Sequence, residues 1–152
     1  MLKRTLALAC GLALVSAPAL AENDDLVIKS SPHGVTETLD RLSDVVEENG
    51  ATVFARIDHA AGASAIDEDL APMEVLIFGN PQMGTPLIQE NPEVGLDLPV
   101  RVLAWEDSSG NTRVAYLEAE ELADRYDIDE DLEAVQNMEQ ALDKLTGAAI
   151  SE

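Results

Sequence analysis

Apolar side chains recur at helical spacing in two long segments of the chain. In residues 35–46, and again in residues 130–145, they follow one another at steps of three or four, which is typical of an amphipathic helix buried along one face. We expect the first helix to end at Gly50 and Asp129 to cap the second. The apolar positions are Val35, Leu39, Leu42 and Val46 in the first segment and Leu132, Val135, Met138, Leu142 and Leu145 in the second.

Five other segments are rich in the β-branched and aromatic residues that favour strands. They are residues 26–30, 51–57, 74–78, 98–105 and 112–117. The third is apolar on both faces, as in a central strand, and the turn-rich residues 107–111 predict a hairpin between the last two.

The segments between these strands predict short connections. Residues 59–65 are expected to form a loop of small residues, and residues 119–126 a helix. Between the third and fourth strands, Thr85 is expected to cap a short helix that has Pro86 at its first position and ends at Asn91.

The order of these elements predicts an α+β domain. It runs strand, helix, four strands, helix, with the short helix inserted between the third and fourth strands. Because hairpins join successive strands, we expect a mainly antiparallel sheet with helices on one face. The predicted domain covers residues 26–147, preceded by an acidic leader over residues 22–25 and followed by a tail over residues 148–152.

The first 21 residues have the pattern of a secretory signal peptide. Lys3 and Arg4 precede an apolar run over residues 6–15, and small residues stand at Ala19 and Ala21. We therefore expect cleavage after Ala21 and a periplasmic or secreted protein. The alternative is lipid attachment at Cys10, although the apolar run before it is shorter than a signal core. No later apolar segment is long enough to span a bilayer, so no stable membrane insertion is expected after cleavage.

Acidic residues dominate the composition. The chain has 30 acidic and 9 basic side chains, a formal charge of -21, and the expected cleavage would remove two basic residues and the single cysteine. Disulfides, thiolate catalysis and cysteine-ligated metals are therefore excluded for the exported part. So strong a negative charge repels phosphate backbones, which excludes nucleic acid as an expected partner.

Asp58 and His59 stand where the second predicted strand ends. A carboxylate and an imidazole there could flank one cleft, and an imidazole titrates near neutral pH, which makes His59 a candidate general base. The structural alternative is that Asp58 caps the loop and His59 donates to a backbone carbonyl, because adjacent strand residues point to opposite faces.

Four further polar or aromatic residues stand at predicted strand ends or caps. The Thr85 hydroxyl and the backbone amides near Asn80 suit a carboxylate or another small anion, although a plain turn and cap would use the same residues. Trp105 and Glu106 end the fourth strand, where a ring and a carboxylate suit the wall and rim of a ligand site or a dimer contact.

Metal ligands are sparse. His33, His59, Met73 and Met83 are the residues that could bind copper or zinc, but no two of them have the spacing of a ligand pair. We assign no metal ligand, and periplasmic copper or zinc binding stays an alternative.

Three blocks of the sequence resemble one known family. They are TVFARIDHA at residues 52–60, LIFGNPQMGTPLIQENPEVGLDLPVRVLAWED at residues 76–107 and VAYLEAEELADRY at residues 114–126, and they resemble the domain of unknown function 302 family. The resemblance implies a compact α+β domain similar in topology to TATA-box-binding-protein-like folds, and it suggests a homodimer. It implies no reaction.

We therefore predict a non-catalytic homodimeric module that binds a small ligand or a partner and needs no cofactor, with a small anion or carboxylate as the possible ligand. Its candidate residues, expected to converge on one site, are Asp58, His59, Asn80, Thr85, Trp105 and Glu106. One alternative is a small hydrolase or isomerase that uses His59 with a nearby carboxylate. Another is a structural partner-binding protein with an exposed apolar patch.

Overall fold

A computed structural model describes residues 25–152 of the chain. The expected signal peptide with Cys10, and the leader as far as residue 24, lie outside the described residues. The elements in chain order are β1 (Leu26–Ser31), α1 (Val35–Glu48), β2 (Thr52–Asp58), α2 (His59–Ser64), β3 (Met73–Gly79), α3 (Pro81–Glu90), the 3-10 helix η1 (Pro92–Leu96), β4 (Val100–Glu106), β5 (Thr112–Leu117), α4 (Ala119–Arg125) and α5 (Glu133–Ala149).

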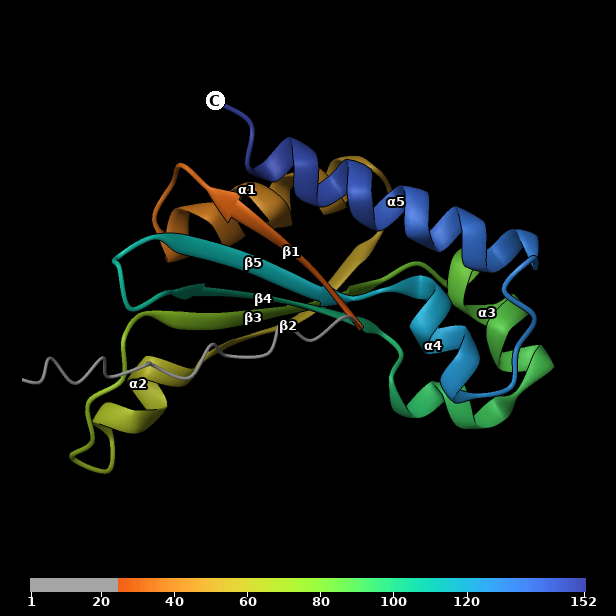
Figure 1. Ribbon diagram of the computed structural model, residues 1–152, viewed down its shortest axis with the longest axis horizontal. Helices are drawn as coiled ribbons and strands as arrows, with labels where there is room; N and C mark the ends of the chain where they lie inside the picture. Colours follow the sequence, from red (N-terminus) through yellow and green to blue (C-terminus); the bar gives the residue numbers. More distant parts are fainter. Residues whose placement is uncertain (1–24) are drawn as a thin grey trace, which may run out of the picture.

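The five strands form one antiparallel sheet, in the order β1-β5-β4-β3-β2. The long helices α1 and α5 lie side by side on one face of it (Figure 1). This confirms the expected α+β fold with a mainly antiparallel sheet. Within residues 25–152, no helix combines the length and the apolar character needed to cross a membrane.

The hydrophobic core lies between the sheet and these two helices. Alternate strand residues such as Leu76 and Val102 point toward the helices, and the apolar faces of α1 and α5 cover them. The helical spacing predicted from the sequence is confirmed, because its main apolar positions are buried. They are Val35, Leu39, Leu42, Val46, Val135, Met138, Leu142 and Leu145.

The middle of the opposite sheet face is covered by none of the described helices (Figure 1). The register directs apolar side chains to this open face, among them Ile28 and Ile57, each 44% exposed. In the part of the chain that the structure describes, none of the strand residues that point this way is Asp or Glu. They are Leu26, Ile28, Ser30, Ala55, Ile57, Met73, Val75, Ile77, Arg101, Leu103, Trp105, Arg113, Ala115 and Leu117.

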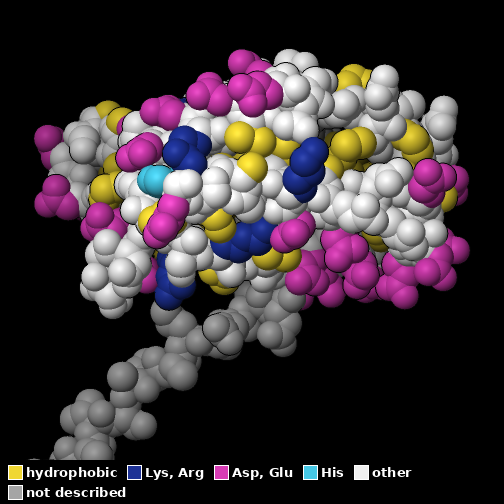
Figure 2. Space-filling view, turned by 90° about the horizontal axis from the view of Figure 1, so that it is seen from above, with side chains coloured by type: hydrophobic (Ala, Val, Ile, Leu, Met, Phe, Trp, Pro, Cys, Tyr) yellow, Lys and Arg dark blue, Asp and Glu magenta, His cyan; other side chains and the backbone are white. Residues whose placement is uncertain are grey.

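Carboxylates gather elsewhere. In the view onto the face formed by α1 and α5, acidic side chains lie mainly toward the margins, while apolar side chains and most of the visible lysines and arginines lie nearer the middle (Figure 2).

Several predicted connections differ from the structure. The expected loop at residues 59–65 contains the helix α2, because Asp58 caps it by accepting from the Ala61 N–H at 2.8 Å. The cap of α3 is Asn80, with Pro81 at the first helical position, so Thr85 and Pro86 lie inside that helix. The prediction of Thr85 as a cap was therefore wrong.

Two predicted boundaries also move. The helix α5 begins at Glu133 rather than near Glu130, because the Asp129 carboxylate closes a turn on the Asp131 N–H at 3.0 Å and caps no helix. The strand β4 begins at Val100, two residues later than expected, since Pro99 has no N–H to donate to a ladder.

Candidate functional site

The structure separates the six predicted site residues into two groups at opposite ends of β3. Asp58 lies opposite Glu74, and Trp105 lies opposite Met73, both at the start of that strand. Asn80 follows Gly79 at its other end, about 20 Å away at the rise of a strand. Asp58, His59, Trp105 and Glu106 therefore stand at one end of the sheet, and Asn80 and Thr85 at the other. The expectation that all six converge on one site was wrong.

The first group does not assemble a catalytic pair. The Asp58 side chain is used to cap α2, and His59 is an exposed first residue of that helix. Trp105 lies on the open sheet face and is half-buried, whereas Glu106 is exposed. Neither Asp58 nor His59 lines either of the two cavities described below.

The candidate metal ligands are likewise apart. The His33 ring bonds the Ser151 carbonyl oxygen at 3.0 Å and lies 3.3 Å from a Glu37 carboxylate oxygen. Met73 faces the open side of the sheet, and Met83 lines a cavity. Within residues 25–152, no three His, Cys, Asp or Glu residues are grouped so that they could hold a metal ion.

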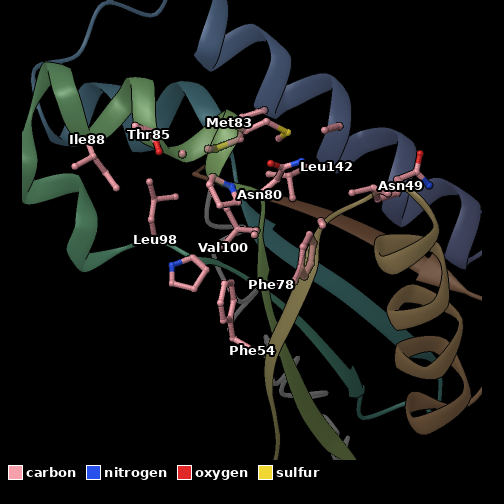
Figure 3. A pocket seen from close by; sticks show the side chains of 18 of the residues that line it. Asn49, Phe54, Phe78, Asn80, Met83, Thr85, Ile88, Leu98, Val100 and Leu142 are labelled. Carbon is pink, nitrogen blue, oxygen red and sulfur yellow. The ribbon is translucent and has the colours of Figure 1, made fainter.

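The second group borders the larger cavity, which has a volume of about 400 Å³. Its floor is the end of the sheet at Phe78, Gly79 and Val100, and its walls are α3 and α5. Figure 3 shows Phe54, Leu98 and Ile88 around the same space. A concave, mainly apolar cavity of this size is typical of a small-molecule site.

A β-bulge in β2 brings Phe54 to this cavity. The pairing of β2 with β3 shifts register between Val53 and Ala55, which leaves Phe54 as the extra residue. Its ring lies close to Gly79, where an added Cβ would stand 3.6 Å from the Phe54 Cε2 and 3.1 Å from the Pro99 Cβ. Gly79 therefore permits the close approach of the ring, which stays 59% exposed at the cavity.

The cap of α3 fixes the opposite wall. The Asn80 carboxamide oxygen accepts from the Gln82 N–H at 2.9 Å, and the Asn80 carbonyl oxygen accepts from the Met83 and Gly84 N–H groups. Thr85 and Ile88 then line the cavity from within the helix. Ile88 is 40% exposed, so two large apolar side chains that border the cavity are in contact with solvent.

Among residues 25–152, one ionisable side chain lines the cavity. Lys144 of α5 donates from Nζ to the Asn49 Oδ1 at 3.1 Å, and the Asn49 Nδ2 donates to the Val45 carbonyl oxygen at 2.8 Å. In Figure 3, Asn49 lies across the cavity from Ile88. The site thus has a cation and an amide on one side, and on the other the apolar side chains of Ile88 and Leu98 with the Thr85 hydroxyl near them.

A second cavity of about 240 Å³ is bordered by residues of the open sheet face, among them Leu103 and Leu117, and by Leu122 of α4. It is bordered by Asp97, which accepts hydrogen bonds from the Tyr126 hydroxyl at 2.8 Å and from Arg101 and Arg125. The Tyr126 hydrogen bond, against the opposing effect of burial and with help from the two guanidinium groups, holds the pKa of Asp97 below its usual range. Asp97 neutralises Arg101, which also borders this cavity, so these charged groups already form a pair.

The sequence signalled part of the larger cavity. Asn80 and Thr85 were singled out because the Thr85 hydroxyl and the backbone amides near Asn80 suit a small anion, and both residues border the cavity. Phe54 and Lys144 were missed. The alternation of apolar and polar residues in one strand does not reveal a β-bulge, which is defined by the pairing of two strands. A lone lysine on an exposed helix face has the pattern of a solvated residue.

Comparisons with known proteins agree with the fold. A family model described as "Domain of unknown function DUF302" matches residues 27–145. A structure described as an uncharacterized conserved protein DUF302 from Bacillus stearothermophilus superposes with a TM-score of 0.68 at 21% identity, over 84% of this chain and 96% of that chain. At this identity the likeness shows the fold alone.

Two similar proteins carry a functional name. Each is called "Fluoride-specific ion channel FluC 1", one from Brucella suis biovar 1 (strain 1330) and one from Brucella abortus biovar 1 (strain 9-941). Both are 45% identical over 103 residues, which is 68% of this chain but 41% and 38% of those proteins. The chain therefore spans about two fifths of their length.

Proposed function

Because the chain belongs to the family of the domain of unknown function DUF302, whose description names no activity, we propose a function from its own cavity: the protein is a non-catalytic binding module that takes up a small, largely apolar molecule. The observation that carries this proposal is the cavity of about 400 Å³ between α3, α5 and the end of the sheet. It is bordered by Phe54 and Ile88, whose exposed apolar surface an apolar ligand would remove from water.

The polar groups of the cavity suit binding rather than hydrolysis. Apart from Lys144, they are the hydroxyl of Thr85 and the carboxamides of Asn49 and Asn80. A nucleophile needs an adjacent base for its activation, and none of the His, Asp and Glu residues within 25–152 borders this cavity.

Gly84 offers a sharp test of this site. An added Cβ at Gly84 would meet only the Leu98 Cδ1, at 3.6 Å, so Gly84→Ala fits without strain. Gly84→Leu would place a full side chain in the cavity. With the uncharged dye Nile red as the probe, we expect the original protein and Gly84→Ala to bind equally and Gly84→Leu to bind at least tenfold more weakly.

The controls separate occupancy from unfolding. Phe54→Ser removes an exposed ring and should weaken dye binding with little loss of stability, and thermal melting should show each variant folded. Leu96→Ser, 80% exposed and away from the cavity, should bind as the original protein does. Unchanged binding in Gly84→Leu would contradict the proposal, as would an original protein that binds no dye.

We further propose that two copies associate through the open sheet face. The whole molecule is strongly acidic, so most surfaces of two copies repel each other. Within residues 25–152, the strands place no carboxylate on the open face. The arginines of this face are each neutralised within one copy, Arg101 by Asp97 and Arg113 by Asp107. Apolar contact can therefore form there with little repulsion.

A pair of double variants tests this contact. Ile28→Glu with Ile57→Glu adds two charges to the open face, and we expect light scattering to report a monomer. Ile66→Glu with Leu96→Glu adds the same charge at exposed positions outside the strands and should leave the dimer intact. A monomeric original protein at both low and high salt would overturn this proposal.

We propose that the protein is exported and acts in the periplasm or outside the cell, on the basis of the pattern in residues 1–21. We also propose that the segment shared with the named channels is a domain of this same fold, since 45% identity extends over 103 residues. We assign no channel activity to this chain, because the match covers the lesser part of those proteins.

A further inference from the structure

Lys144 differs from the other cations of the described chain in having neither a carboxylate nor a backbone partner. Its hydrogen bond goes to the Asn49 carboxamide, and Arg41 donates to the carbonyl oxygens of Ala149 and Ser151. Each remaining lysine or arginine within residues 25–152 pairs with an acidic side chain: Lys29, Arg56, Arg101, Arg113 and Arg125.

This exception lies at the cavity. Acidic residues outnumber basic ones by 30 to 9, so a lysine that no carboxylate neutralises is unexpected on composition alone. An ammonium group has three donors, and the contact with Asn49 uses one of them. The Asn49 carboxamide is itself held by its bond to Val45, which orients its oxygen toward Lys144. Two donors of Lys144 are thus available to a ligand.

We propose that the ligand is an amphiphile with an anionic head and an apolar chain, such as a medium-chain carboxylate, whose head binds Lys144 and whose chain lies against Phe54, Ile88 and Leu98. This inference rests on the proposed binding function and names its ligand class. The two sides of the cavity match the two parts of such a molecule. Lys144 lies beside Asn49 on one side, and Figure 3 shows Ile88 and Leu98 on the other side, with the Thr85 hydroxyl near them.

The net charge of the protein works against any anion, so salt is a poor probe of this contact. Added salt weakens the attraction of Lys144 and also the repulsion by the whole molecule. Variants that change one charge separate the two effects. Lys144→Gln removes the cation, whereas Gln136→Glu makes the same change in net charge at an exposed position of α5 that does not border the cavity.

Displacement of Nile red by decanoate, decyl sulfate and decanol tests the ligand class. We expect decanoate to bind Lys144→Gln roughly two- to fivefold more weakly than the original protein, as for loss of one exposed ion pair. Decanol should bind both equally, and Gln136→Glu should bind decanoate as the original protein does. Lys144→Arg should retain most of the binding.

The outcomes distinguish this inference from the binding function itself. If decanoate and decanol compete equally in the original protein and in Lys144→Gln, the anionic class is wrong and the apolar site stands. If decyl sulfate is favoured and decanoate is not, the head group is not a carboxylate. If neither the dye nor any competitor binds the original protein, the binding function fails as well.

Discussion

Single residues at two helix ends use the same left-handed backbone with different side chains. Gly50 follows α1 with φ 77°, and Asp127 follows α4 with φ 52°. Both helix ends have an equivalent hydrogen bond. The Ala51 N–H donates to the Val46 carbonyl oxygen at the end of α1, and the Ile128 N–H donates to the Ala123 carbonyl oxygen at the end of α4. Sequence predicted the first stop because glycine is the usual residue there. The second stop was also predicted to within one residue, since the helix was expected to end at residue 126, although Asp127 and not glycine adopts the left-handed backbone there.

Asp127→Gly should therefore stabilise the protein. Glycine adopts positive φ without a Cβ contact, and the change also removes a negative charge from a helix C-terminus. We expect a gain of about 0.5–1 kcal/mol in the free energy of unfolding, measured in urea. Gly50→Ala is the matched reverse change and should cost about 1–2 kcal/mol. A loss of stability in Asp127→Gly would show that its side chain makes a contribution not seen in these contacts.

A second residue-scale effect concerns Asp97 and pH. Its pKa is lowered in the folded protein, first by the Tyr126 hydroxyl, so the ionised form stabilises the fold at pH values above its unfolded pKa of about 3.9. That contribution is lost as the pH falls through the lower, folded pKa.

We expect Asp97→Asn to be less stable than the original protein at pH 7, and the difference to shrink when the pH is lowered to about 3. Thermal melting at both pH values measures this. Asp69→Asn, which changes an exposed carboxyl in the connection between α2 and β3, should match the original protein at both. A difference between Asp97→Asn and the original protein that is equal at the two pH values would exclude the ionised carboxylate as its cause.

At the scale of elements, local spacing predicted the long helices and all five strands, but not every boundary. Asn80-Pro81 and Thr85-Pro86 both have the pattern of a cap followed by a first-turn proline. The structure uses the earlier pair, and Pro86 lies in the helix interior. Which pair begins the helix depends on where β3 delivers the chain, and this tertiary fact is absent from local sequence.

Arg56 joins two strands to α1 through buried charge. It pairs with Asp40 of α1 and, at 2.6 Å, with Glu74 of β3, and it also donates to the Thr36 carbonyl oxygen. Glu74 is 8% exposed and accepts from the Thr36 hydroxyl as well. Removing the guanidinium would leave this carboxylate buried without its cation.

Arg56→Met should therefore destabilise the fold by about 3 kcal/mol in urea denaturation. The double variant Arg56→Met with Glu74→Met, which replaces the pair by apolar side chains, should recover most of that loss. If the double variant is as unstable as Arg56→Met alone, the cost lies in lost packing of the arginine side chain and not in an unpaired Glu74.

At the scale of the whole molecule, we expect repulsion among the carboxylates to be the dominant electrostatic effect. The acidic excess is far larger than the few ion pairs of the described residues can offset. Charge of one sign opposes the compact state, and salt screens it. Composition alone predicts this repulsion, because it depends on the net charge and not on where the charged residues lie in the sequence.

The melting temperature should accordingly rise as salt is increased from about 0.05 M to 1 M, over which the Debye length falls several-fold. Potassium chloride is the suitable salt because it lacks the strong exclusion effect of sulfate. A melting temperature that falls across this range would mean that the specific ion pairs outweigh the general repulsion.

The prediction that six residues converge on one site was wrong because of the geometry of the whole sheet. The ends of the strands were predicted correctly. In an antiparallel sheet, however, successive strands finish at opposite ends of the sheet. His59 follows β2 and Asn80 follows β3, the next strand along the chain, so the two residues lie at opposite ends of the sheet. Only the strand order and its register, which no single segment encodes, decide which polar ends meet.

The larger cavity draws its walls from residues 49–54, 78–88, 98–100 and 138–145, which are remote from one another along the chain. A ligand bound there would contact all of these segments at once. At a free ligand concentration of about a hundred times the Kd, binding would add ~2.7 kcal/mol to the free energy of unfolding. Ligand binding should consequently slow proteolysis throughout the domain, and not only at the residues that contact the ligand.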